Sequence, residues 1–193
     1  MKRSLCATIW LLILSSFITF SSVNAQQPAA KEPPQEPKTK LEAFEKQTGT
    51  VVIKGYSEIG KIQEMGKVSV DCIELTDPST GTKQFGVIIE VAGGGKYERE
   101  DRSFIDYEEI DPLIRGIEYI SKVTTSSTKL KNFEAIYKTK GDLQVVTFSS
   151  SGKVDAAIKS GRIGAATAFV SLAKLATFKD LLSQAKQKID SIK

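Results

Sequence analysis

The spacing of apolar residues changes along the chain, and this change separates predicted strands from predicted helices. From residue 50 to residue 105, apolar residues alternate with polar ones or form short runs, as in strands that are buried on one or both faces. We expect four strands here, over residues 50–56, 67–75, 84–91 and 96–105. The turn-forming stretches Asp77–Gly81 and Ala92–Gly95 favour antiparallel hairpins between them.

An apolar stripe at helical spacing follows the fourth strand and comprises Leu113, Ile114, Ile117, Ile120 and Val123. Asp111 and Pro112 suit a helix start, because Asp accepts an unpaired backbone N–H and Pro has none to leave unpaired. Asp106 with Glu109 also fits a capping box, but a helix begun there would contain Pro112 at a cost of about 3 kcal/mol. We therefore predict a turn or short 3₁₀ segment over 106–110 and a helix from Asp111 to about residue 123.

The same order of elements follows a second time. We expect strands over residues 132–139, 143–148, 154–159 and 166–171 and a final helix over about 172–192. Apolar residues 65 positions apart correspond, namely Phe104 with Phe169, Ile105 with Val170, Ile110 with Leu175, Leu113 with Phe178 and Ile117 with Leu182. We interpret this as an internal repeat of sheet plus helix; the alternative is two unrelated strand-to-helix junctions.

These elements predict an α+β fold, with antiparallel sheet or sheets, helices packed on one face, and a tandem four-strand-plus-helix repeat. The order resembles that of Whirly-type domains, which bind single-stranded nucleic acid. The resemblance is in layout alone and includes no family motif. Because the chain also begins with a predicted export signal, nucleic acid is not the partner that we expect.

The first 25 residues have the pattern of a secretory signal peptide. Lys2 and Arg3 precede an apolar run over residues 7–20, and Val23 and Ala25 provide the small residues of a cleavage site. We expect cleavage after Ala25 and export to the periplasm or the extracellular space, with an uncleaved anchor as the alternative. The short leader and the lack of N-glycosylation sequons favour a bacterial protein.

Residues 26–40 contain four prolines and no large apolar side chain, which predicts a disordered, extended tether. Residues 41–193 then form a single α+β domain, with 50–123 and 131–193 as two similar halves. A short helix over 41–47 would place Leu41 and Phe44 on one face. We find no further apolar run that could span a membrane, so we expect no integral span after cleavage.

The chain contains no histidine. This excludes Ser-His-Asp and Cys-His catalysis and the usual zinc sites. Of the two cysteines, Cys6 lies in the predicted signal peptide and Cys72 lies in a predicted strand, so no internal disulfide can form in the mature chain. We expect Cys72 to be buried and inert, with a disulfide between two chains as the alternative.

Acidic residues crowd the stretch before the first long helix, at Glu98, Glu100, Asp101, Asp106, Glu108, Glu109 and Asp111. Calcium sites and glycoside hydrolases both use carboxylates, but the calcium-loop order D-x-[DN]-x-[DN]-G is absent. The loop at Gly93–Lys96 does not fit the phosphate-binding motif G-x-x-x-x-G-K-[ST], because Tyr97 stands where Ser or Thr is required. We therefore assign no catalytic residue, no metal ligand and no cofactor. A histidine-free hydrolase that uses residues 98–111 is kept as an alternative function.

The two halves carry opposite charge, since residues 26–110 hold 11 basic and 16 acidic residues and residues 111–193 hold 14 and 7. A basic second half could bind an anionic polymer or a membrane surface, or could pair with the acidic half. The candidate ligand-binding residues are Lys122, Lys131, Tyr137, Lys138, Lys140, Lys159 and Arg162. Our main hypothesis is an exported, soluble interaction module, monomeric or weakly self-associating, in which an open sheet face or edge meets a protein or anionic polymer.

Overall fold

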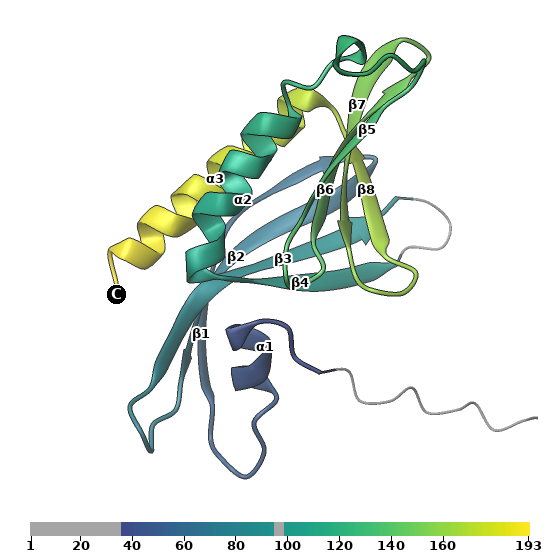
Figure 1. Cartoon of the computed structure of the whole chain (residues 1–193). Coiled ribbons are helices and arrows are strands. Elements are labelled where there is room, and N and C mark those ends of the chain that lie inside the picture. The colour runs from purple at the N-terminus through teal and green to yellow at the C-terminus, as the bar shows by residue number, and fades with distance from the viewer. Residues whose placement is uncertain (1–35, 95–98) are drawn as a thin grey trace, which may run out of the picture. The chain divides into compact units, whose positions relative to one another are not determined.

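The computed structural model describes residues 36–94 and 99–193, and here two antiparallel four-strand sheets each lead into a long helix (Figure 1). The first sheet contains, in spatial order, β1 (Ile53–Glu64), β2 (Gly66–Thr76), β3 (Lys83–Gly93) and β4 (Glu100–Asp106). The second contains β5 (Glu134–Lys138), β6 (Gln144–Ser150), β7 (Lys153–Ser160) and β8 (Ala166–Val170). The helices are α1 (Lys40–Glu45), α2 (Tyr107–Ile120), α3 (Leu172–Asp190) and the 3₁₀ segment η1 (Thr125–Ser127).

The predicted α+β fold with a tandem four-strand-plus-helix arrangement is confirmed. The predicted signal peptide, its cleavage site and residues 26–35 of the predicted tether lie outside the described residues. Within the described part, no helix has both the length and the apolar composition needed to cross a membrane.

One hydrophobic core joins the two halves. Helices α2 and α3 lie side by side, linked by an ion pair between Glu118 and Lys179, and they cover the face of each sheet that we call the inner face (Figure 1). Both sheets contribute alternate apolar residues to this core, such as Val70 and Ile89 from the first and Val145 and Ile158 from the second. A buried pair of hydroxyls, Ser103 Oγ and Ser160 Oγ at 2.7 Å, also connects β4 to β7.

The predicted start of α2 at Asp111 is wrong, because the helix begins at Tyr107 and contains Pro112. The earlier start adds Ile110 to the buried stripe of α2, and burying one such side chain stabilises a fold by about 1.5–3 kcal/mol. It also places the Glu109 carboxylate where it accepts a hydrogen bond from the Lys140 backbone N–H (2.8 Å). The burial of Ile110 offsets most of the cost of about 3 kcal/mol for proline inside a helix.

Strand β1 is longer than predicted, since it continues past residue 56 to Glu64. Its second half is rich in polar residues and glycine, and the pairing with β2 shifts register between Glu58 and Gly60. Period-two alternation is lost at such a bulge, which explains why the sequence pattern missed it.

The short predicted helix near residue 41 is present as α1, which packs on the outer face of the first sheet, opposite α2 and α3. Leu41 and Phe44 are buried there, in a cluster with Ile73, Leu75, Ile88 and Phe104. The side chain of Asp106 holds the start of α1, because its two oxygens accept hydrogen bonds from the backbone N–H groups of Lys40 (3.0 Å) and Leu41 (3.1 Å).

Cys72 is buried, as expected from its place in β2. Its thiol donates a hydrogen bond to the carbonyl oxygen of Ala185 in α3 (3.3 Å). Burial raises the pKa of the Cys72 thiol to about 11, so the reactive thiolate is scarce at neutral pH.

Candidate binding surface on the second sheet

The outer face of the second sheet carries a continuous row of apolar side chains. Strand pairing aligns Ile136 of β5, Val146 of β6, Ala157 of β7 and Phe169 of β8 across the sheet, and we call these four residues the apolar row. The two inner members are buried, whereas Ile136 and Phe169 at the ends are 45% and 46% exposed. Their neighbours along each strand point the other way, into the core beneath α2 and α3.

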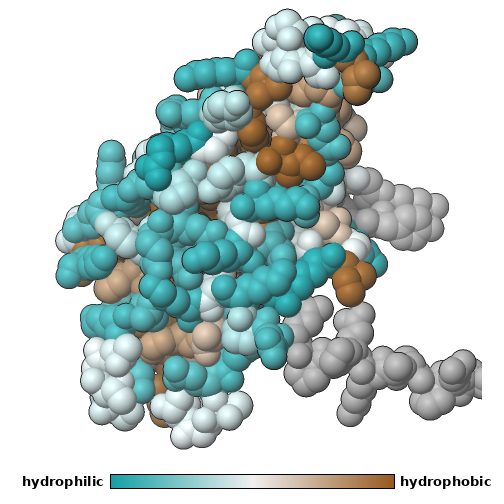
Figure 2. Space-filling model, in the orientation of Figure 1, coloured by the Kyte–Doolittle hydropathy of each residue, from teal (hydrophilic) through white to brown (hydrophobic). Residues whose placement is uncertain are grey.

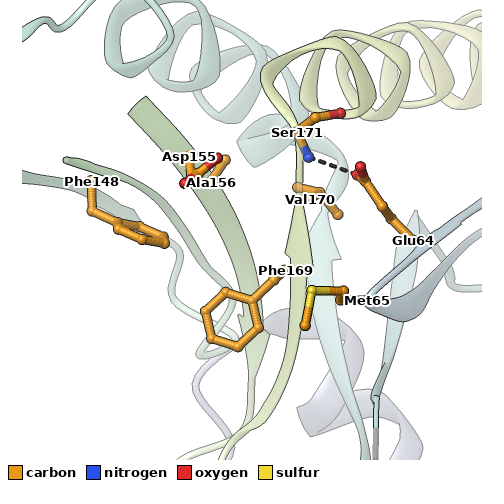
Figure 3. A pocket seen from close by; sticks show the side chains of 8 residues that line it. All are labelled: Glu64, Met65, Phe148, Asp155, Ala156, Phe169, Val170 and Ser171. Carbon is orange, nitrogen blue, oxygen red and sulfur yellow. Dashed lines mark hydrogen bonds between the residues drawn. The ribbon is translucent and has the colours of Figure 1, made fainter. Parts of the chain in front are cut away.

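A groove of about 400 Å³ opens beside the apolar row (Figure 3). Phe148 lies diagonally across β7 from Phe169, and the two rings meet edge to face with centroids 6.3 Å apart. Met65, which is 68% exposed, flanks the other side of Phe169. The full lining is Glu64, Met65, Phe148, Asp155, Ala156, Phe169, Val170 and Ser171.

Backbone hydrogen bonds fix the position of the groove. Met65, in the turn between β1 and β2, exchanges two backbone hydrogen bonds with Phe169, one of 3.3 Å and one of 2.9 Å. The Glu64 carboxylate accepts a hydrogen bond from the Ser171 backbone N–H at 2.7 Å, where β8 passes into α3 (Figure 3). The first sheet therefore closes one side of a groove that the second sheet forms.

Lysines line one side of the apolar row. Strand pairing aligns Lys138, Gln144, Lys159 and Thr167 in the next row of the outer face. No ion pair within the described part of the chain includes Lys138 or Lys159. A second hollow of about 470 Å³ contains Lys159 together with Phe133, Phe148 and Phe169. Glu134 lines this second hollow and Asp155 lines the first groove, so cations, carboxylates and aromatic rings share this face. Figure 2 shows apolar surface gathered over the second sheet.

The seven residues predicted to bind an anionic ligand do not form one patch. Lys138 and Lys159 share the outer face, but Tyr137 belongs to the inner face and packs against the core beside Gly116 of α2. Arg162 forms ion pairs with the carboxylates of Asp142 and Glu42.

The remaining three predicted residues are spread over different connections. The backbone of Lys140 is held in the β5–β6 turn by its hydrogen bond to Glu109. Lys122 follows the end of α2, and Lys131 lies in the segment between η1 and β5. The sequence pattern predicts the lysines but not the apolar row or Phe148. Side chains alternate between the two faces of a strand, so Phe169 lies opposite Ala168 and Val170, which belong to the core.

The acidic stretch before α2 does not converge on one site. Asp106 holds the start of α1, Glu108 forms an ion pair with Lys40, and Asp111 lies 3.8 Å from the Lys186 ammonium. Glu100 and Asp101 belong to β4, and Glu98 lies outside the described residues. No group of acidic or cysteine side chains in the described segments could hold a metal ion.

Glu109 is the most unusual member of this stretch. It is buried, and its Oε2 atom has no hydrogen-bond partner among the described residues. Burial is the main cause that raises the pKa of the Glu109 carboxyl, and the nearby carboxylates of Asp106 and Glu108 raise it further. The Lys140 backbone N–H and ammonium act in the opposite direction.

Comparison of the chain with protein-family models, curated proteins and solved structures finds no match. Exposed aromatic and aliphatic side chains can bind apolar groups of a partner, and lysines without a carboxylate partner can bind anions beside them.

Proposed function

We propose that this protein is an interaction module and that the outer face of its second sheet binds another protein. The observation that carries the proposal is the exposure of Phe169 and Ile136 at the two ends of a continuous apolar row, beside a groove that Phe148 and Met65 complete. An apolar surface bordered by polar residues is typical of a site that another molecule covers.

The chemistry of the row favours a protein partner. Aromatic residues and methionine are enriched at the centres of protein interfaces, where they fill pockets and exclude water. Phe169, Phe148 and Met65 are of these types and line one groove. The lysines lie outside the apolar row, in the position of a polar rim.

Photocrosslinking in the producing cells tests this proposal. Benzoylphenylalanine in place of Phe169 keeps an aromatic side chain on the proposed surface, and the same residue in place of Tyr119 is the control. Tyr119 is 77% exposed and lies on α2, away from the second sheet's outer face. We expect a discrete protein adduct from position 169 and none from position 119. Equal labelling at both positions, or none at 169, would show that this face is not an interface.

A second candidate function is binding of an anionic polymer, favoured by Lys138 and Lys159, which lie in one row and have no ion-pair partner among the described residues. Each cation that contacts the polymer adds to the salt dependence of binding. We expect the double change Lys138→Gln and Lys159→Gln to lower the salt concentration that elutes the protein from heparin. The control changes Lys174 and Lys188 of α3 to Gln, which removes the same charge elsewhere. If both doubles elute alike, net charge alone explains the retention.

A further inference from the structure

The two outer faces of this protein correspond, yet only one is covered in the described structure. Asp106 directly precedes α2, and Ser171, 65 residues later, directly precedes α3. By the same offset Phe104 of β4 corresponds to Phe169 of β8, and both lie on outer faces. Phe104 is 5% exposed beneath α1, whereas Phe169 is 46% exposed.

Helix α1 shows what a ligand of such a face supplies. Leu41 and Phe44, three positions apart and therefore on one side of the helix, pack on the apolar residues around Phe104. Glu45, the last residue of α1, places its carboxylate between two cations of the same face, 3.0 Å from Lys54 and 3.2 Å from Arg102. One short helix thus provides both the apolar and the anionic contacts.

The outer face of the second sheet also presents apolar and cationic side chains, but no helix covers it in the described structure. The row that contains Phe104 reads Glu58, Asp71, Ile88 and Phe104, while the corresponding row of the second sheet is apolar throughout. Two cations, Lys138 and Lys159, border that row without a carboxylate partner in the described chain. The apolar row thus has no acidic member, unlike its counterpart. The lysines border it on one side and Glu134 and Asp155 border it on the other, so a carboxylate of a ligand is matched on the lysine side only.

We propose that the outer face of the second sheet binds a short amphipathic helix of a partner protein, in the way that the first sheet binds α1, with a carboxylate of that helix facing Lys138 and Lys159. This inference rests on the proposed function and names the partner's chemistry. Two apolar side chains three or four positions apart enter the groove between Phe148, Phe169 and Met65, and an adjacent carboxylate pairs with Lys159 or Lys138.

An extended peptide would use a different part of the sheet. It would add to the edge strand β5, which pairs with β6 alone among the described strands, since β8 at the other edge already pairs with Met65. The groove lies on the face, beside β8, and not at the β5 edge. The α1 of the same chain cannot serve as ligand, because Leu41 and Phe44 are already buried on the first sheet.

Selection from a random displayed peptide library distinguishes these modes. The mature protein is the target, the Phe169→Ser variant is the counter-selection target, and peptides of about 12 residues allow three helical turns. We expect Phe169-dependent peptides with apolar residues at i and i+3 or i+4 and with Asp or Glu beside them. Their affinity should fall about tenfold or more in Phe169→Ser, should fall in the Lys138→Gln and Lys159→Gln double variant, and should be unchanged in Tyr119→Ser.

The results distinguish a wrong ligand from a wrong binding face. Phe169-dependent peptides with alternating apolar residues, with proline-rich motifs, or without a carboxylate beside the apolar residues would overturn the helix proposal and leave the interaction module intact. The absence of any Phe169-dependent peptide, together with no adduct at position 169, would overturn both. Thermal unfolding checks that Phe169→Ser folds, and Ile136→Ser, at the other end of the row, repeats the test if it does not.

Discussion

The two sheets share strand order and the step from the last strand into a helix, but their outer faces differ. On the first, α1 covers Phe104 and makes it part of a second small core with Leu41 and Phe44. On the second, Phe169 occupies the corresponding place and faces a groove. The position of such an aromatic residue on its strand therefore does not decide whether it belongs to the core or to a binding surface. What packs above the strand decides it.

The covering helix is too short to be stable by itself. Six residues make fewer than two helical turns, and isolated helices of this length do not persist in water. Helix α1 therefore depends on the packing of its Leu41 and Phe44 against the first sheet and on the Asp106 carboxylate, which holds its start. A partner helix on the second sheet would form under the same conditions, ordering as it binds.

The largest expected difference is between Phe104→Ala and Phe169→Ala. Removing a buried phenylalanine side chain costs about 3–5 kcal/mol, so Phe104→Ala should destabilise the fold by that amount. Phe169 is half exposed, and its replacement should cost about 1 kcal/mol or less. Urea unfolding measures both. Equal losses would show that Phe169 belongs to the stabilising core, which would remove the contrast between the two faces.

A smaller effect is expected where the two halves meet. Ser103→Ala leaves the buried Ser160 hydroxyl without its 2.7 Å partner, and an unpaired buried polar group costs about 1–3 kcal/mol. The double change of both serines to alanine removes the orphan and should be less destabilising than the sum of the single changes. Unfolding of the two single variants and the double variant provides the cycle. Strict additivity would mean that the hydroxyls do not couple the halves.

Much of the fold could be predicted from apolar residues spaced two apart in strands and three or four apart in helices, because buried faces repeat with these spacings. The start of α2 could not, since the gain from burying Ile110 and from the Glu109 hydrogen bond appears only when the β5–β6 turn packs beside it. The same holds for the candidate surface. Phe104 and Phe169 have equivalent sequence positions, and only the docking of α1, 60 residues earlier in the chain, separates core from surface.

The two helix junctions should also respond differently. Asp106→Ala removes both hydrogen bonds that hold the start of α1 and should cost about 1–2 kcal/mol. Ser171→Ala removes one hydrogen bond of 3.4 Å, from the Lys174 N–H within α3, and should cost about 0.5 kcal/mol. Hydrogen exchange locates the effect: faster exchange of the Leu41 amide in the first variant and of the Lys174 amide in the second. If Asp106→Ala instead frees amides of α2, the carboxylate caps its own helix.

The smallest effect concerns pH and the first turn of α2. Because burial raises the pKa of Glu109 in the folded state, the folded protein binds a proton over a pH range in which the unfolded chain has lost it. Stability therefore falls as pH rises from the unfolded pKa, about 4.3, through the raised folded pKa, and stays lowered above it. Glu109→Gln removes this loss, so the variant should gain stability relative to the natural protein between about pH 4 and pH 7.

Lys174 of α3 provides the matched control, since it lies 65 residues after Glu109 in the first turn of the corresponding helix. Lys174→Gln removes no carboxyl group, so it should leave the pH slope of the unfolding free energy unchanged between about pH 4 and pH 7. A slope unchanged in Glu109→Gln as well would mean that the carboxylate reaches water or a counter-charge in solution. Asp106 and Ser171 would then still differ in the helix whose start they hold, α1 for Asp106 and α3 for Ser171. Neither junction would bury a charge.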